Sequence, residues 1–418
     1  MTSLSIRDAA SILTLEGSAP VRGDTWAQVE ARPGGSLTID DGAIVSVGRP
    51  SDGTDAVLDA RDCAVIPGLV DCHTHLPFYG WRADEDAARL SGVRYEDIHG
   101  RSGGIFRSAQ LLAGATDEQV TAFSARLALE MLRSGTTTFE TKSGYGLSFP
   151  GELRQLRLAR ELAGLVPQTV ATTCLAAHAV PEGKDQGQWV GEAANDLLPR
   201  AAADGLCSAV DLYVESIAFA LEHAARLAEA ARAEGLAMRV HADQLADNQT
   251  ASFAARWGFR SADHLNHTSL DAVDDLAASD TAAVLLPGAT FTLRQSAKPP
   301  ARELVKAGAI VALATDLNPG TSPISSLPLA MALGCRLYGL SPLEAVVAAT
   351  VNAAYVLGLQ DEVGRLEPGL RADAVVVEAP SFEHLVYRPD ADHIIAVICG
   401  GRLAYLAPGA EPRLRRAS

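Results

Sequence analysis

The chain has 418 residues, 48% of them hydrophobic, and its 35 basic and 51 acidic residues give a net charge of −16. This composition is typical of a folded globular protein and excludes a disordered or fibrous chain. The acidity argues against nucleic acid or a membrane surface as a partner, because both bind a basic face. We find no run of 18 apolar residues and no leader-like N-terminus, so we expect a cytoplasmic protein.

Short β-like segments bounded by turn residues come first, over residues 26–35, 36–48 and 56–68. The end of the chain has the same pattern, over residues 372–380 and 393–406. Chain termini commonly lie close together at a domain surface, so we expect these two ends to pair. They would form one small domain of residues 1–66 and 365–418, beside a large domain of residues 67–364.

Eight short apolar segments alternate with helical patterns between the two ends. The predicted strands are residues 69–75, 136–142, 169–178, 210–216, 237–243, 261–267, 282–288 and 309–316. Two helices, predicted over 122–135 and 218–235, have apolar residues at helical spacing and end at Gly135 and Gly235. Eight strand-helix repeats favour a closed (β/α)8 barrel, although a doubly wound open sheet would give the same pattern.

Polar residues follow nearly every predicted strand at its C-terminal end. They are His73 and His75, Lys142 and Tyr145, His178, Glu215, His241, Asp263 and His264, and Asp316. In an α/β barrel the loops at that end bring distant residues together and form the active site. We therefore expect the function to lie at one rim of the barrel.

Two of these residues, His73 and His75, lie two positions apart on a strand and so face the same side. A bare H-x-H pattern is most often polar surface or a pair of satisfied core histidines. Here His241 and Asp316 supply two further ligands from other strand ends, which favours a metal site. Zinc and iron both suit this donor set.

Single polar residues near the proposed metal have both a structural and a functional interpretation. A lone strand-end histidine such as His178 or His264 is more often structural, yet His264 could serve as a base or acid beside a metal-bound water. Asp263 could orient His264 or simply cap the strand. Gln244 has no titratable group, so we expect it to form hydrogen bonds to a substrate.

Arg82 follows the first strand and could hold a carboxylate between its two guanidinium N–H groups. The alternative is a solvent-exposed ion pair with Asp84 or Glu85. The simplest interpretation of the glycine-rich segments 143–146 and 318–321 is that they are turns. Their position at the rim is the reason to expect ligand contacts from them.

From about Pro67 to Arg402 the sequence resembles the amidohydrolase superfamily, and within it the imidazolonepropionase family. The motifs that carry the likeness include PGLVDCHTH (67–75), RLSGVRYEDI (89–98), SGGI (102–105), KSGYGL (142–147), HADQL (241–245), SADHL (261–265) and ATDLNPGTSP (314–323). KSGYGL together with NPGTSP is far more specific than H-x-H, which the whole superfamily shares. The resemblance implies a TIM-like (β/α)8 barrel with a small β-sandwich domain built from both chain termini.

The resemblance also implies a reaction and its residues. The expected reaction is the hydrolysis of 4-imidazolone-5-propanoate to N-formimidoyl-L-glutamate in histidine degradation, through a metal-activated hydroxide. One zinc or iron ion is expected on His73, His75, His241 and Asp316. Substrate contacts are expected from Arg82, Tyr145, His178, Gln244 and Thr321, and product contacts from Asn318 and Gly320. His264 and Asp316 are the expected catalytic residues.

This sequence departs from the family pattern near the proposed carboxylate contact. Tyr79-Gly80-Trp81 stands where two glycines and a small polar residue are usual, and Leu317 replaces a cysteine. The alternative function is another amidohydrolase reaction, either on a different cyclic amide or deaminating a heterocycle. A barrel without catalysis is disfavoured, because all four ligands are present. A small-molecule substrate and a homodimer, the commonest oligomer, are the partners we expect.

Overall fold

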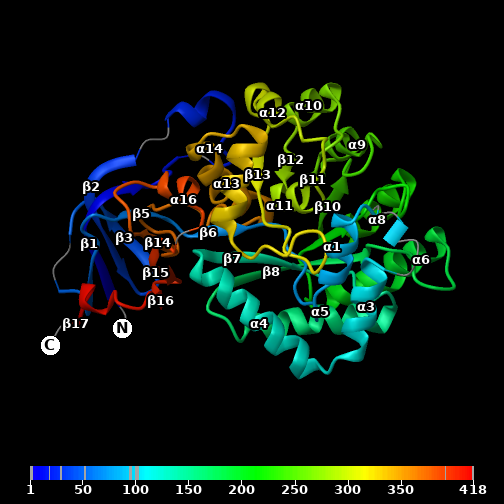
Figure 1. Cartoon of the computed structure of the whole chain (residues 1–418), viewed down its shortest axis with the longest axis horizontal. Helices are drawn as coiled ribbons and strands as arrows, with labels where there is room; N and C mark the ends of the chain where they lie inside the picture. The colour runs from blue at the N-terminus through cyan, green and yellow to red at the C-terminus, as the bar shows by residue number, and fades with distance from the viewer. Residues whose placement is uncertain are drawn as a thin grey trace.

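A computed structural model of the chain describes residues 3–17, 19–28, 31–50, 53–93, 97–98, 103–390 and 392–416. Two sheets organise these residues, one with nine strands and one with eight. Figure 1 shows the nine-stranded sheet, with both chain ends beside it, on the left, and the eight-stranded barrel on the right. In the described residues no helix is long and apolar enough to cross a membrane.

All eight strands predicted for the middle of the chain are confirmed. They are β6 (Leu69–Asp71), β7 (Thr136–Lys142), β8 (Thr169–Ala177), β9 (Ala209–Leu212), β10 (Ala237–Ala242), β11 (Ser261–His264), β12 (Ala282–Leu285) and β13 (Val311–Leu313). Neighbouring strands are parallel and follow one another in chain order. This simple order is that of a barrel, and it excludes a doubly wound sheet, in which the order reverses.

The first and last barrel strands meet through the residues that follow them. In the described part of the chain, a single parallel bridge joins Thr74 to Leu317. On either side of it, the Asp316 N–H donates to the His73 carbonyl at 3.0 Å, and the His75 N–H donates to the Leu317 carbonyl at 2.9 Å. The barrel is therefore closed at the height of the predicted metal ligands.

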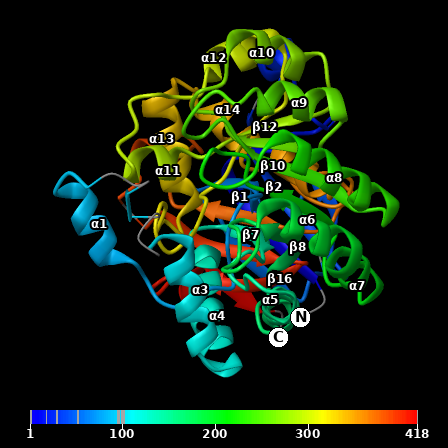
Figure 2. The same ribbon diagram turned by 90° about the vertical axis from the view of Figure 1, so that its right-hand side faces the viewer.

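Helices surround the barrel strands (Figure 2). They are α1 (Ala83–Leu90), α3 (Ile105–Gly114), α4 (Asp117–Arg133), α5 (Phe149–Ala163), α6 (Gln186–Glu192), α7 (Leu198–Ala203), α8 (Leu221–Ala233), α9 (Thr250–Trp257), α10 (Leu270–Ala277), α11 (Pro287–Thr292), α12 (Ala301–Ala307), α13 (Leu327–Tyr338), α14 (Pro342–Ala348) and α15 (Val351–Leu357). A further short helix, α16 (His384–Tyr387), lies between two strands of the terminal sheet in the sequence and packs against α13. A π-helical turn, η2 (Ala193–Leu197), joins α6 to α7, and a short 3-10 helix, η3 (Glu411–Arg413), lies near the C-terminus.

The two helices predicted from periodicity exist with shifted starts. Helix α4 begins earlier than expected, because Thr116 and Gln119 form a capping box. Helix α8 begins three residues later than expected, where the Ala220 N–H donates to Nδ1 of His223 at 3.1 Å. Both helices are followed by the predicted glycines, whose φ angles of 95° and 70° suit a residue without a side chain.

The two chain ends form one sheet, as predicted. Its strands are β1 (Ser3–Leu13), β2 (Ala31–Asp40), β3 (Ala43–Val47), β4 (Ala56–Asp59), β5 (Ala64–Pro67), β14 (Ala374–Val377), β15 (Ile394–Cys399), β16 (Arg402–Leu406) and β17 (Leu414–Arg416). The strand expected from residue 26 is wrong at its start, because residues 23–28 form a 3-10 helix, η1 (Gly23–Gln28). Trp26 on it is buried in the core that this sheet shares with the barrel.

Side chains of the terminal sheet alternate between two cores. Val375 and Val377 belong to the core shared with the barrel, whereas Val376 belongs to a separate core inside the sheet. Only Gly68 separates β5 from β6, and a Cβ there would lie 2.2 Å from Oγ1 of Thr137. We propose that the domains divide here, as predicted, with residues 1–66 and 365–418 on one side.

Candidate active site

A small cavity of about 30 Å3 lies at the C-terminal rim of the barrel, where the predicted site residues converge. It is lined by His75, Arg82, Ile105, Tyr145, His178, Tyr213, His241, Gln244, His264, Asp316, Asn318 and Thr321. Of the predicted site residues, only His73 and Gly320 do not line it. These residues lie at or beyond the C-terminal ends of seven different strands, so barrel closure is what brings them together.

Three imidazoles gather at the base of the cavity. The Nε2 atoms of His73 and His75 are 3.3 Å apart, and the ring centroid of His241 lies 4.6 Å from that of His73. Nitrogens of these three rings all lie within 4.8 Å of one another. One carboxylate oxygen of Asp316 is 3.2 Å from Nε2 of His75 and 3.6 Å from Nε2 of His73.

The donor atoms of this cluster fit a bound cation. Nε2 of His241 and both carboxylate oxygens of Asp316 are buried and have no hydrogen-bond partner. Leaving such atoms unpaired in the interior is costly, whereas a divalent metal accepts lone pairs from imidazole and carboxylate. A second group of donor atoms, again within 4.8 Å of one another, comes from His73, Asp316 and His264. His264 was predicted as a catalytic residue rather than as a ligand.

Backbone strain occurs at two of these strand ends. His264 has φ +83° and Asp316 has φ +55°, in the left-handed region that non-glycine residues rarely adopt. Such conformations persist where the surrounding structure enforces them, and they are concentrated at functional sites. In this backbone conformation both side chains line the cavity.

Two carboxylates below the cavity hold the imidazoles in place. Nδ1 of His73 lies 2.6 Å from Asp263, and Nδ1 of His241 lies 3.1 Å from Asp211. Each acid binds Nδ1–H and so leaves Nε2 of its histidine directed at the cluster, the usual arrangement behind a metal ligand. The suggestion that Asp263 orients His264 is wrong, because its carboxylate faces His73 across the barrel.

Buried charges connect these two carboxylates through the barrel interior. Nζ of Lys142 lies 2.9 Å from Asp211 and 2.7 Å from Glu140, and Arg239 binds both Glu140 and Asp263. Although burial raises the pKa of Asp211, the charges of His241 and Lys142 hold it well below its usual range. The network therefore supplies fixed negative charge beside the His241 ring.

Burial keeps four histidines of the site neutral. It lowers the pKa values of His73, His75 and His178 well below the usual range. Burial also lowers the pKa of His264 to about 3, against the opposing charge of Asp316. Neutral imidazole is the form that binds a metal or accepts a proton, so these four side chains are in the form needed for either role at neutral pH.

Arg82 is buried beside the cavity rather than exposed to solvent. Its Nη1 lies 3.4 Å from a carboxylate oxygen of Glu85, also buried, whereas Asp84 pairs with Arg107. Nε and Nη1 of Arg82 have no hydrogen-bond partner. The expected solvent-exposed ion pair is thus a buried one, with donors left for a ligand carboxylate.

Gly320 makes room for that guanidinium. A Cβ at position 320 would lie 1.8 Å from Nη2 of Arg82. The adjacent Asn318 accepts from the backbone N–H groups of Gly320 at 2.9 Å and Thr321 at 2.7 Å, and its own Nδ2 donates to the Asp316 carbonyl. The side chain of Asn318 thus shapes the turn that positions Arg82 and Thr321.

The loop that carries Tyr145 is fixed by two side chains of helix α5. Glu152 accepts from the N–H groups of Gly144 and Leu147, each at 2.8 Å, and Gln155 accepts from the Tyr145 N–H at 2.9 Å. Burial raises the pKa of Glu152 to about 7. This bonding places the Tyr145 ring over the cavity.

His178 packs against this loop and against a predicted metal ligand. Its ring is stacked on His75, with centroids 5.2 Å apart, and its Nδ1 lies 3.2 Å from the Gly144 carbonyl. A strand-end histidine with such contacts has a structural role, and it also lines the cavity.

Two lining residues, Tyr213 and Ile105, were not predicted. Tyr213 lies two positions before Glu215, so period-two alternation places both on one face, a signal that the sequence offered. Glu215 itself accepts from the N–H of Leu245 at 2.8 Å and from Nδ2 of Asn248 at 2.9 Å, and so shapes the loop that carries Gln244.

The bulky departure at residues 79–81 does not reach the cavity. Trp81 is 36% exposed and packs on Phe78 and Phe123, with ring centroids 5.3 and 5.9 Å away. Within the family-like motifs, residues 94–96 of RLSGVRYEDI and Ser102 of SGGI lie outside the described residues.

Comparison with known proteins decides the family. The Amidohydrolase family model matches residues 64–404. The chain belongs to the amidohydrolase family. It is 43% identical over 418 residues to the imidazolonepropionase of Rubrobacter xylanophilus, covering 98% of this chain and 99% of that protein. It is 44% identical over 376 residues to the imidazolonepropionase of Paracoccus denitrificans, covering 88% and 94%.

Solved amidohydrolase-like structures share the fold at lower identity. The atrazine chlorohydrolase of Arthrobacter aurescens, complexed with zinc, has a TM-score of 0.70 at 17% identity, covering 96% of this chain and 94% of its own. An adenosine deaminase from Xanthomonas campestris with bound zinc has a TM-score of 0.69 at 19% identity, covering 98% and 97%. These likenesses support the (β/α)8 barrel, and both proteins bind zinc.

Proposed function

We propose that the chain hydrolyses 4-imidazolone-5-propanoate to N-formimidoyl-L-glutamate in histidine degradation. The observation that carries the proposal is the buried Arg82 at the edge of the His/Asp cluster, because its Nε and Nη1 have no hydrogen-bond partner. A carboxylate-binding arginine beside a candidate metal site matches a cyclic amide that bears a propanoate arm. Relatives of full length that carry the name imidazolonepropionase support it.

The ion is proposed to be zinc or iron, held by His73, His75, His241 and Asp316. When bound, a cation of this kind would lower the pKa of a water ligand towards about 7 and so supply hydroxide at neutral pH. Asp211 and Asp263 hold two of the imidazoles by Nδ1, which fixes the face that they turn to the ion.

The remaining residues bind the substrate and move its proton. Arg82 binds the propanoate, while Tyr145, His178, Gln244 and Thr321 surround the ring. The Asp316 carboxylate accepts the proton of the attacking water and delivers it to the ring nitrogen as the C–N bond breaks. The neutral His264 donates a hydrogen bond to the oxyanion at the former carbonyl, an interaction worth roughly 3 to 4 kcal/mol. Asn318 and Gly320 contact the opened product.

An assay of ring opening tests the proposal directly. The wild-type holoenzyme should open imidazolone propanoate, and Arg82→Gln should raise KM about tenfold or more with a smaller change in kcat, because the arm is bound alike in substrate and transition state. A panel of other cyclic amides and aminopurines serves as the comparison. Turnover of a panel member without activity on imidazolone propanoate would replace the proposal with another amidohydrolase reaction. Cytoplasmic location and a homodimer stay predictions.

A further inference from the structure

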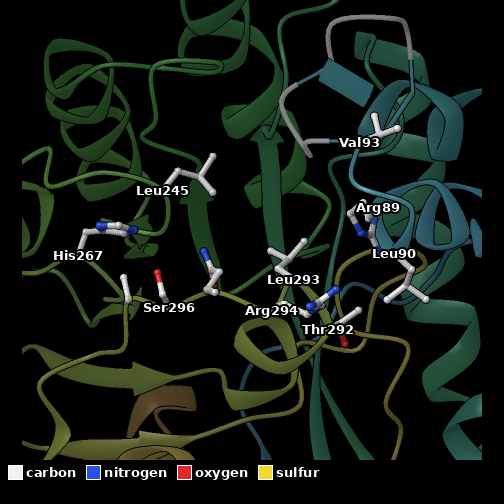
Figure 3. Close-up of a pocket in the computed structure, with 11 residues that line it drawn as sticks. Arg89, Leu90, Val93, Leu245, His267, Thr292, Leu293, Arg294 and Ser296 are labelled. Atoms are coloured by element: carbon white, nitrogen blue, oxygen red, sulfur yellow. The ribbon is translucent and has the colours of Figure 1, made fainter.

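A second cavity of about 300 Å3 opens at the same end of the barrel, and we call it the outer cavity. Figure 3 shows Arg89, Leu90 and Val93 of the α1 region on one side and Leu245 and His267 on the other. Arg294 belongs to the segment that follows α11 and lines the cavity between them. The outer cavity therefore lies among the same rim loops that form the candidate active site.

The two cavities share a wall. Nη2 of Arg89 donates to the Gly320 carbonyl at 2.8 Å, next to the turn that lines the active site. Nε2 of Gln295 donates to the carbonyl of Gln244 at 2.9 Å, and the following residue, Leu245, lines the outer cavity. The active-site cavity is small, about 30 Å3, whereas the outer cavity on the other side of this wall is about 300 Å3.

The outer cavity is basic in a strongly acidic protein. Arg89, Arg294 and His267 line it, and no Asp or Glu is among its described lining residues, although the chain carries a net charge of −16. The Arg89 side chain is only 8% exposed, and its Nη2 also binds Asp86 at 2.7 Å. Nε and Nη1 of Arg89 are buried without a partner. Unpaired guanidinium donors of this kind bind carboxylates.

We propose that the outer cavity is a carboxylate-binding subsite through which the substrate enters and the product leaves. The choice of ligand rests on the proposed function. Ring hydrolysis adds a water oxygen to the carbonyl carbon and breaks its C–N bond, so that carbonyl becomes a second carboxylate. The product is a dicarboxylate, and Arg89 lies next to Gly320 on the side of the wall away from the reacting centre.

Glutarate, a dicarboxylate with the carbon spacing of the product, is the probe. It is titrated by calorimetry into the Arg82→Gln holoenzyme, in which the inner carboxylate contact is absent. We expect one site to remain there. Adding Arg89→Gln should weaken its Kd about tenfold, and adding Arg294→Gln, an exposed position, about two- to fivefold. Arg256→Gln, whose side chain is 68% exposed on α9, is the matched control and should leave the Kd unchanged.

Two results would overturn the inference. One is no glutarate binding to Arg82→Gln at up to about 20 mM, a concentration that detects even weak sites. The other is binding that neither Arg89→Gln nor Arg294→Gln changes. If Arg89→Gln does not fold, Arg294→Gln and the charge-retaining Arg89→Lys decide. The glutarate titration measures no turnover, so it is independent of the ring-opening assay. If ring opening fails but glutarate binding depends on the arginines, only the proposed function is removed. If ring opening succeeds but glutarate binding does not depend on the arginines, only this subsite is removed.

Discussion

The barrel interior and the terminal sheet bury opposite kinds of side chain. Between the barrel strands, Glu140, Lys142, Asp211 and Arg239 are buried and bonded to one another. The core inside the terminal sheet consists instead of aliphatic residues such as Ile398. Burying charges is expensive and often contributes nothing to stability, whereas burying aliphatic groups is the main stabilising contribution.

This difference separates two tasks. The barrel carries a network whose carboxylates hold the imidazoles of the candidate active site. The terminal sheet carries no part of that site in the described residues, and its apolar faces stabilise the chain. Substitutions in the two regions should therefore affect different measurements.

The largest effect is expected at the imidazole cluster. His241→Ala removes a buried nitrogen that no other group satisfies, so we expect loss of bound metal and a fall in kcat/KM of at least about a thousandfold. Metal analysis and the ring-opening assay measure the two effects. His223→Ala, on α8 away from the site, is the control. Undiminished metal content in His241→Ala would remove this residue from the ligand set.

In the terminal sheet the expected effect is on stability alone. Ile398→Ala leaves a cavity in a fully buried position, so the free energy of unfolding should fall by about 2 to 5 kcal/mol. Denaturant unfolding measures this change. The kcat/KM of the folded variant should stay at the wild-type value, and a large decrease would show that the two regions are coupled.

A smaller effect, on metal affinity, is expected at the carboxylates that hold the imidazoles of the cluster. Asp211→Asn removes the charge that faces Nδ1 of His241, so metal affinity should fall about 10- to 100-fold, as measured by competition with a chelator. Asp280→Asn, a 90% exposed carboxylate paired with Arg22, is the matched control and should change nothing. Equal affinities in the two variants would contradict the role given to Asp211.

The smallest effect concerns pH. Burial raises the pKa of Glu152 from 4.5 to about 7, so the folded state keeps a proton that the unfolded state has lost. Its contribution to stability is complete below pH 4.5 and is lost as pH rises through about 7. The free energy of unfolding should therefore decrease between about pH 5 and 8, by up to about 2 kcal/mol more than in Glu152→Gln. Parallel pH profiles for the two proteins would refute this.

The sequence predicted the barrel well because eight short strand-like segments alternate with helical patterns, and nearly every segment is followed by a polar residue. Strand β1 was missed, although it pairs with β2, β4 and β5 near the centre of the terminal sheet. Its register shifts between Ile6 and Ala9, where Asp8 has φ 59°, so its apolar residues do not alternate regularly along the sequence.

The candidate ligands were predictable, and their partners were not. Strand alternation placed His73 beside His75 from the sequence alone. Which carboxylate each imidazole meets depends on contacts across the barrel, as between His73 and Asp263, 190 positions apart. The same holds for Arg82, whose burial is set by its approach to Gly320 and not by its own neighbours in the chain.

The joint between the first and last barrel strands has a consequence for assembly of the centre. Three of the four proposed ligands flank it, with His73 and His75 after β6 and Asp316 after β13, and only one bridge joins these segments in the described residues. A cation shared between them would link the two segments directly. Its binding energy then adds to the energy needed to open the barrel there, so loss of the ion should first loosen the protein along this line.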